Sequence, residues 1–176
     1  GIIGFGRIGQ RTGEIAKALG MRVLAFDAYQ SDAGRAIASY VDLDTLLRES
    51  DVISLHCPLF PETKGIVNAD SIAKMKDGVM IVNAARGGIV DEEALVRAVK
   101  AKKVAAAAFD VFVKEPIDKD HPFLGLEEVI CTPHLGASTA EAQERVALEI
   151  AEQIVDFLGK GIVKNAVNVP ALPPEV

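Results

Sequence analysis

The sequence contains no tryptophan and only two cysteines. Aromatic residues are also few and make up 5% of the chain. Cys57 and Cys131 lie far apart without the spacing of metal ligands, so we expect neither a disulfide framework nor a metal site. This cysteine usage is typical of a reducing compartment, and we therefore expect a cytoplasmic location. No apolar run approaches the roughly 20 residues of a membrane-spanning helix, and no signal peptide is visible.

An excess of positive charge is also absent. The formal net charge is −6, and acidic and basic residues are interspersed along the chain. Neither a nucleic-acid partner nor an anionic membrane surface is therefore expected. The 176 residues are 49% hydrophobic, enough for one large domain or one domain with an appendage. The first strand is already under way at Gly1 without an initiator methionine, and we interpret the chain as part of a longer protein.

Short apolar runs alternate with helical patterns along the chain. Strands are expected at residues 1–5, 22–26, 51–55, 79–83, 104–109 and 128–131, and helices at 7–19, about 31–38, 43–49, 69–76 and 91–101. Fully apolar strands indicate burial on both faces, as in a parallel sheet covered by helices. The pattern predicts an α/β fold of the Rossmann type, a doubly wound parallel sheet with helices on both faces.

A dinucleotide-binding motif opens the chain. An apolar strand runs into Gly4-Phe5-Gly6-Arg7-Ile8-Gly9, a helical segment follows, and the next strand ends at the acid Asp27. In this motif Gly4 permits the tight turn, Gly6 lets backbone approach a pyrophosphate, and Gly9 lets the helix pack close to the strand. The helix N-terminus attracts phosphate, and Asp27 can accept hydrogen bonds from ribose hydroxyls. The alternative is a glycine-rich turn without a ligand.

Polar residues follow the other predicted strands, at the sheet edge where ligands of open α/β sheets bind. They are His56-Cys57-Pro58, Ala84-Ala85-Arg86-Gly87-Gly88, Asp110 and Thr132-Pro133-His134-Leu135-Gly136. His134 is the best candidate for a general acid and base, with a turn histidine as the alternative. Arg86 could bind a substrate carboxylate bidentately, through two of its guanidinium nitrogens, or it could be a surface arginine. By themselves, Glu115 and His121 are expected in solvated loops.

A second segment begins after residue 137. Ser138 and Glu141 resemble a capping box, which predicts a long helix to about Leu158. The proline-rich end, up to Val176, is typical of a linker. We therefore divide the chain into a dinucleotide-binding domain at 1–137 and a long helix with its linker at 138–176.

Four motifs together resemble the D-isomer-specific 2-hydroxyacid dehydrogenases. They are Gly4 to Gly9, Asn83 to Asp91, Phe109 to Phe112 with Glu115-Pro116, and Pro133 to Thr139. The resemblance implies NAD as cofactor, His134 as proton donor and acceptor, Glu115 as its hydrogen-bond partner and Arg86 as the substrate-binding cation. It also implies a cofactor cleft that is lined by the glycine loop with Arg7 and Ile8, by Asp27, His56, Cys57, Pro58, Ala84, Ala85 and Asp110, and by Gly136 and Ala137 beside His134.

The resemblance further implies a substrate domain that is missing from this chain, toward which the helix after Ser138 would return. The apolar side chains Val146, Ile150, Ile154 and Phe157 are then expected to be partly exposed. Family members commonly form homodimers through the cofactor domain. The motifs are most similar to those of members that oxidise 3-phosphoglycerate in serine biosynthesis. Reduction of glyoxylate or hydroxypyruvate, oxidation of D-lactate, and a NAD-sensing transcriptional corepressor stay open as alternatives.

Overall fold

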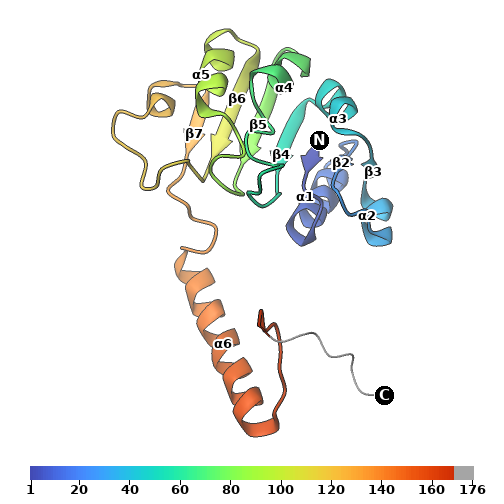
Figure 1. Ribbon diagram of the computed structural model, residues 1–176, viewed down its shortest axis with the longest axis vertical. Helices are drawn as coiled ribbons and strands as arrows, with labels where there is room; N and C mark the ends of the chain where they lie inside the picture. The colour runs from blue at the N-terminus through green and yellow to red at the C-terminus, as the bar shows by residue number, and fades with distance from the viewer. Residues whose placement is uncertain (169–176) are drawn as a thin grey trace. The chain divides into compact units, whose positions relative to one another are not determined.

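The computed structural model describes residues 1–168. These residues fall into two compact units, of which the first ends at His134 and the second begins at Leu135. The first unit holds a seven-stranded parallel sheet in the order β3-β2-β1-β4-β5-β6-β7 (Figure 1). The strands are β1 (Ile2–Ile3), β2 (Leu24–Phe26), β3 (Ser39–Tyr40), β4 (Val52–Leu55), β5 (Val79–Asn83), β6 (Val104–Phe109) and β7 (Val129–Cys131). The helices of this unit are α1 (Arg7–Ala18), α2 (Asp32–Ile37), α3 (Leu43–Glu49), α4 (Ala69–Lys74), α5 (Glu92–Lys100) and the 3-10 helix η1 (Pro122–Gly125).

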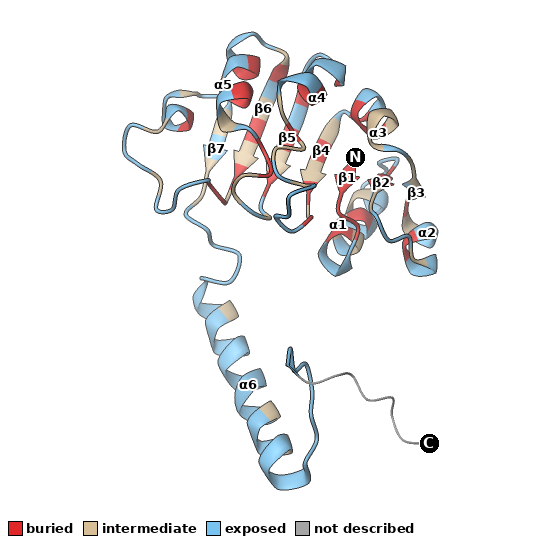
Figure 2. Ribbon diagram, viewed as in Figure 1, coloured by how far each residue is buried: buried red, intermediate tan, exposed pale blue. Residues whose placement is uncertain are grey.

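Helices cover both faces of this sheet because neighbouring strand residues point to opposite sides. Ile3 packs in a large core with the buried faces of α3, α4 and α5, whereas Ile2 packs in a smaller core with α1 and α2. Figure 2 shows the buried residues in red along the strands and on the inner faces of these helices. The α/β fold expected from the alternating pattern is therefore confirmed.

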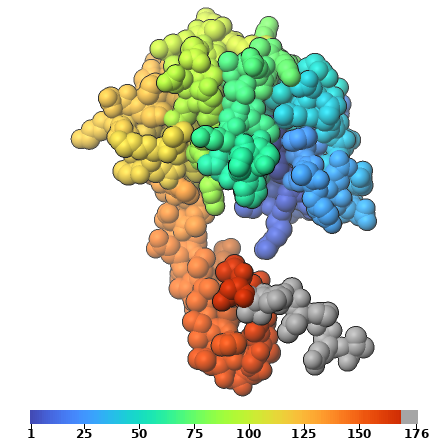
Figure 3. Space-filling model, in the orientation of Figure 1, coloured from blue at the N-terminus to red at the C-terminus, as the bar shows by residue number. Residues whose placement is uncertain are grey.

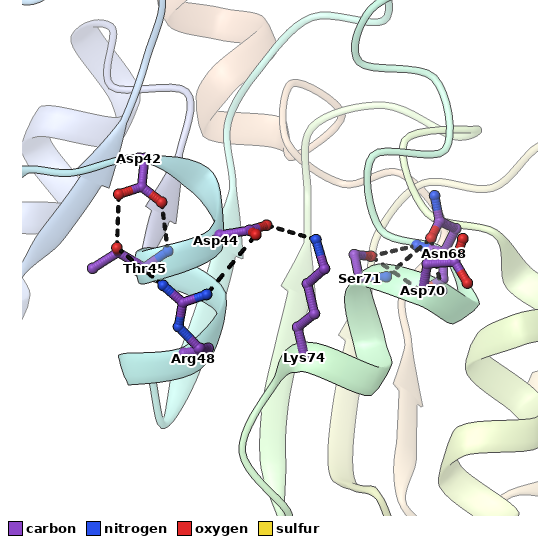
Figure 4. Close-up of polar contacts among 8 residues, drawn as sticks. All are labelled: Asp42, Asp44, Thr45, Arg48, Asn68, Asp70, Ser71 and Lys74. Atoms are coloured by element: carbon purple, nitrogen blue, oxygen red, sulfur yellow. Dashed lines mark hydrogen bonds and ion pairs between the residues drawn. The ribbon is translucent and has the colours of Figure 1, made fainter.

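Side-chain caps mark where most helices begin. Asp42 and Asn68 cap α3 and α4, and Asn68 forms a capping box with Ser71 (Figure 4). A Lys74–Asp44 ion pair of 2.7 Å joins the two helices on the surface. Each cap satisfies N–H groups that the first helical turn leaves without a partner. Short polar residues at these positions thus explain why the helices start where they do.

Three local features differ from the sequence-based expectation. The strand β3 and the helix η1 were not predicted, because each is only a few residues long and neither coincides with a continuous apolar run. The expected cap at Ser138 is wrong: Thr139 is the N-cap of α6 (Ala140–Lys160), and its hydroxyl accepts a hydrogen bond from the amide of Ala142. Register within a capping motif depends on backbone dihedral angles, which a sequence pattern locates only to within a residue or two.

The second unit consists of α6 and the segment that follows it. No residue of α6 is buried, and Val146, Ile150, Ile154 and Phe157 are about half exposed, as expected from the sequence. The helix ends at Gly161, whose φ of 68° is the left-handed conformation typical of a helix C-terminus. The prolines from Pro170 onward lie outside the described residues.

In the space-filling view (Figure 3), the side chains of the first unit form one continuous packed surface on the visible face. Among the helices of the described residues, none is long and apolar enough to cross a membrane.

Candidate active site

The candidate site lies at the carboxyl edge of the sheet, where the strand order reverses between β1 and β4. The arrowheads of β1, β4, β5 and β6 point the same way in Figure 1, so their following loops share one edge. Gly4 leaves β1 with a φ of 88°, and an added Cβ would overlap the backbone of His56 and Cys57. Only glycine therefore lets the two loops approach this closely. Such a reversal point is where open α/β sheets bind their ligands.

The N-terminus of α1 is open to a ligand. The other helices of residues 1–168 have a side-chain cap, from Ser31, Asp42, Asn68, Asp91, His121 or Thr139. In α1 the cap position is Gly6, no side chain caps the helix, and its first turn carries no acid. A Cβ on Gly6 would meet nothing within 4 Å, and the side chains of Arg7 and Ile8 are exposed. This arrangement of backbone N–H groups fits the pyrophosphate of a dinucleotide.

Gly9 is buried on the opposite side of the same turn. A Cβ at this position would collide with the carbonyl oxygen of Gly4, so the helix can pack against the strand only with glycine here. The three glycines of the motif therefore have three different environments: backbone contact at Gly4, open space at Gly6 and helix packing at Gly9.

Asp27 follows β2 and holds the glycine loop from the side. Its Oδ2 accepts a hydrogen bond from the Phe5 amide at 2.5 Å, and its Oδ1 accepts one from the Tyr29 amide at 2.8 Å. A carboxylate has about four acceptor positions, so Asp27 keeps capacity to accept ribose hydroxyls. Its side chain is half-buried beside the α1 N-terminus, which is the place the sequence motif predicts for it.

The loop after β4 forms the other wall beside Gly4. His56 is half-buried and its Nε2 lies 2.9 Å from the Ser54 hydroxyl, while burial lowers the pKa of its imidazole. Cys57 is buried, and burial, with a smaller effect of the Asp27 charge, raises the pKa of its thiol. Pro58 is exposed at the rim. Burial thus favours the neutral form of both His56 and Cys57, which line the wall chiefly by their shape.

The loop after β5 is shaped by a buried asparagine that sequence reasoning missed as a site residue. The Asn83 Nδ2 donates to the carbonyl of Arg86 at 3.0 Å, and its Oδ1 accepts from the amide of Ala85 at 3.1 Å. The exposed Arg86 guanidinium donates to the Ala85 carbonyl at 2.6 Å, and Ala84 is exposed beside it. A polar residue at the end of an otherwise apolar strand was the available signal, because a buried amide needs partners.

The predicted pair of Glu115 and His134 is in direct contact. The His134 Nδ1 lies 2.7 Å from the Glu115 Oε2, and the other carboxylate oxygen accepts the Phe112 amide at 2.9 Å. The His134 hydrogen bond is the main cause that lowers the pKa of Glu115, and the Phe112 amide adds to it. Because the ionised carboxylate accepts from Nδ1–H, the Nε2 of His134 is the ring nitrogen available to a reacting group. Glu115 lies in an exposed loop, as its sequence context predicts, and the hydrogen bonds hold it there.

The imidazole borders a hollow on one side. A cavity of about 250 Å³ is lined by Phe112, Glu115, Pro116, Ile117, Pro133 and His134. His134 itself has a φ of 54°, a conformation that few residues other than glycine adopt, and such conformations concentrate at functional sites.

Asp110 lies at the end of β6 and links two neighbouring loops. Its Oδ1 accepts a hydrogen bond from the Thr132 hydroxyl at 2.6 Å, and its amide donates to the Asn83 carbonyl at 3.0 Å. It thereby joins the loops that carry Arg86 and His134. Gly136 and Ala137 belong to the second unit, where both are exposed.

Comparisons with known proteins agree with this geometry. Residues 1–136 match the family model of the D-isomer specific 2-hydroxyacid dehydrogenase, NAD binding domain. The chain is 53% identical over 169 residues to a hydroxypyruvate reductase of Blautia hydrogenotrophica, covering 96% of this chain and 52% of that protein. It is 52% identical over 177 residues to a D-3-phosphoglycerate dehydrogenase of Archaeoglobus fulgidus, covering 99% of this chain and 33% of that protein.

A solved structure gives the same result. The D-lactate dehydrogenase of Aquifex aeolicus, complexed with NAD and lactic acid, has a TM-score of 0.79 and 37% identity, with 89% of this chain and 52% of that chain covered. The chain thus spans about half, or less, of the length of these relatives. The family match over residues 1–136, together with the glycine loop and the Glu115–His134 pair, shows that this chain belongs to the D-isomer specific 2-hydroxyacid dehydrogenase family, to its NAD-binding domain.

Proposed function

We propose that this chain is the cofactor domain of a two-domain, NAD-dependent dehydrogenase that interconverts a D-2-hydroxy acid and its 2-keto acid. The observation that carries the proposal is the 2.7 Å contact between Glu115 and His134, at the same sheet edge as an uncapped helix N-terminus. Oxidation of an alcohol needs a base for the hydroxyl proton, a cation for the substrate anion and a nearby hydride acceptor. When bound, NAD supplies the hydride acceptor.

In this proposal His134 moves the proton. Glu115 holds Nδ1–H, which directs the Nε2 lone pair toward the substrate hydroxyl and stabilises the imidazolium that forms when Nε2 takes the proton. In the opposite direction the same Nε2–H protonates the developing alkoxide. The two fixed oxygens of Glu115 keep the ring from rotating between these steps.

Arg86 binds the substrate anion. Its planar guanidinium suits a carboxylate and the neighbouring carbonyl oxygen, and the loop that carries it is held by Asn83. The exposure of Arg86 supports this role, because a substrate can reach it. We assign the remaining surface of the substrate pocket to a second domain, for which the greater length of the relatives gives room.

The substrate that we propose is 3-phosphoglycerate, which would place the protein in serine biosynthesis. The similarity to the Archaeoglobus protein supports this choice, but the equal similarity to a hydroxypyruvate reductase favours hydroxypyruvate as the second candidate. Glyoxylate, D-lactate and the corepressor function are the further alternatives. Steady-state assays of the two-domain protein with 3-phosphoglycerate, hydroxypyruvate, glyoxylate and pyruvate separate them, since a corepressor turns over none of the four.

The variant His134→Ala of the two-domain protein tests the catalytic assignment. We expect kcat to fall by about 10²- to 10⁴-fold, the usual contribution of a positioned acid or base, while the affinity for NAD stays nearly unchanged. A variant with near wild-type kcat would contradict the role of His134, and His56 would be the next histidine to test.

We propose that the domain prefers NAD to NADP. A 2′-phosphate on the ribose would face the Asp27 carboxylate, and the two residues after it, Ala28 and Tyr29, carry no positive charge. Titration with both cofactors should show tighter binding of NAD than of NADP. The variant Asp27→Ala should reduce this difference in affinity, mainly by weakening the binding of NAD. Equal or tighter binding of NADP by the unchanged protein would refute this.

We also propose a cytoplasmic homodimer that forms through this domain. Support comes from the sheet face opposite α4 and α5, where Met80 of β5 is 43% exposed and Ile130 of β7 is 67% exposed. A second copy could cover such an apolar face while leaving the carboxyl edge of the sheet open. Light scattering should give the mass of a dimer at micromolar concentration, and a monomer there would contradict the proposal.

A further inference from the structure

The peptide between Phe112 and Val113 lies at the junction of the proposed catalytic loops. The Phe112 amide donates to Glu115 Oε1 at 2.9 Å, and the next amide, of Val113, donates to Glu92 Oε1 at 2.9 Å. On its other side, an added Cβ on Gly87 would overlap the Phe112 carbonyl. The backbone at Phe112 therefore touches Gly87, the residue next to Arg86, and the two consecutive amides of Phe112 and Val113 are held by separate carboxylates.

Glu92 has the same kind of environment as Glu115. Each carboxylate accepts one of these two consecutive backbone amides with one oxygen and contacts a histidine with the other. For Glu92 the histidine is His121, whose Nε2 lies 3.2 Å from Oε2. The two side chains are each 17% exposed, so the prediction that His121 lies in a solvated loop is wrong.

The proton of His121 can be placed from its second contact. The Nδ1 of His121 accepts the Phe123 amide at 3.3 Å, so the ring proton is on Nε2 and points at Glu92. The ring lies edge-on to Phe123, with centroids 4.9 Å apart, and to Phe112, with centroids 5.8 Å apart. Packing on both aromatic rings fixes the imidazole, and the fixed imidazole holds the carboxylate of Glu92.

We propose that Glu92 and His121 form a positioning pair, which sets the Phe112–Val113 peptide and through it the orientation of Glu115 and His134. This inference rests on the proposed dehydrogenase function. Neither residue touches the reacting groups. The Phe112 amide can restrain Glu115 only if the backbone at Phe112 is fixed, and Glu92 fixes that backbone through the next amide along the chain, of Val113.

The pair requires a carboxylate at position 92. Two donors, the Val113 N–H and the His121 Nε2–H, converge on its two oxygens. A glutamine of the same shape has one oxygen and one NH₂ group, so one donor would face another donor. Glu92→Gln therefore breaks one of the two contacts with little change in volume.

The experiment compares Glu92→Gln with Glu93→Gln in the two-domain protein. Glu93 is the next residue of α5, and its side chain is 90% exposed and lies 3.6 Å from Arg97. With the fastest of the four substrates named above, Glu92→Gln should lower kcat by roughly 10- to 100-fold, the cost of a small misplacement of catalytic groups. The KM for NAD should not change, and Glu93→Gln should stay within about twofold of wild type, as a surface substitution does. Equal kcat values for the two variants would overturn the proposal.

A spectroscopic readout separates this inference from the proposed function. The His134 Nδ1–H held by Glu115 should give a ring ¹H–¹⁵N signal, which is assigned by its loss in His134→Ala. The signal should persist in Glu93→Gln and shift or disappear in Glu92→Gln, whether or not the protein turns over any substrate. Inactivity of the wild type with all four substrates would refute the proposed function alone, and an unchanged signal in Glu92→Gln would refute the positioning pair.

A second pair of variants applies if Glu92→Gln does not fold. His121→Gln places an N–H donor near the position of Nε2, whereas His121→Leu removes it. We expect the His134 signal and kcat to be retained in the first and altered in the second. Identical behaviour of the two variants would overturn the proposal.

Discussion

Replacing Gly6 by alanine separates cofactor binding from folding. Gly6 has φ −74° and ψ −161°, which an alanine adopts without strain, and a Cβ there would meet nothing within 4 Å. The free energy of unfolding should therefore change by less than about 0.5 kcal/mol, or rise slightly because alanine restricts the unfolded chain.

The same methyl group should weaken NAD binding. It would stand at the uncapped N-terminus of α1, where we place the pyrophosphate. A phosphate displaced by a methyl group loses hydrogen bonds to backbone N–H groups, and each hydrogen bond to a charged group contributes about 1.5–3 kcal/mol. Loss of one such bond raises Kd by roughly 10- to 100-fold.

Calorimetric titration with NAD and thermal unfolding of the same samples measure the two effects. Gly125→Ala is the matched control, since a Cβ on Gly125 also meets nothing within 4 Å and that residue lies in η1, away from the glycine loop. The expected result is a loss of affinity in Gly6→Ala alone, with both unfolding temperatures near wild type. Wild-type NAD affinity in Gly6→Ala would refute the placement of the pyrophosphate at this helix end.

Three further predictions concern the walls of the site. Gly4→Ala should lower the free energy of unfolding by about 3 kcal/mol or more, because the added Cβ overlaps backbone and the φ is unfavourable for alanine. Gly20→Ala is the control, since Gly20 has a similar φ of 82° but a Cβ there meets nothing within 4 Å. It should lower the free energy of unfolding by only about 1 kcal/mol, as measured by chemical denaturation. Asn83→Ala leaves the Ala85 amide and the Arg86 carbonyl without partners and should cost about 1–3 kcal/mol, with a raised KM for the 2-hydroxy acid. The folded-state pKa of Glu115 lies below its ordinary value of 4.5, so its carboxylate stabilises the fold above pH 4.5, and this contribution is lost as the pH falls through the lowered pKa. The stability difference between wild type and Glu115→Gln should therefore be full at pH 6 and vanish in strong acid, and a difference independent of pH would contradict it.

The elements that the sequence predicts best are those encoded by neighbouring residues. Apolar runs locate six of the seven strands, and the glycine spacing together with Asp27 locates the nucleotide loop before any contact is known. Parallel strands of this kind place their following loops at one edge, so His134, Arg86 and Asp110 could be assigned to a common site.

Other features depend on segments that are distant in the chain. His121 and Glu92 are separated by 29 positions, and nothing near either residue in the sequence marks them as a partly buried pair. The importance of Asn83 likewise depends on how the Arg86 loop folds back over it.

The amino-acid sequence by itself determined the alternation of strands and helices, the dinucleotide motif and the family. These features follow from periodicity and from backbone conformations that only particular residues adopt. The tertiary structure alone decided that Glu92 and His121 form a partly buried pair, and that Asn83 holds the loop of Arg86. The physical reason is that a side chain is buried or hydrogen-bonded only when another segment contacts it. Segments that are distant in the sequence come into contact only after the sheet has formed and brought its loops to one edge.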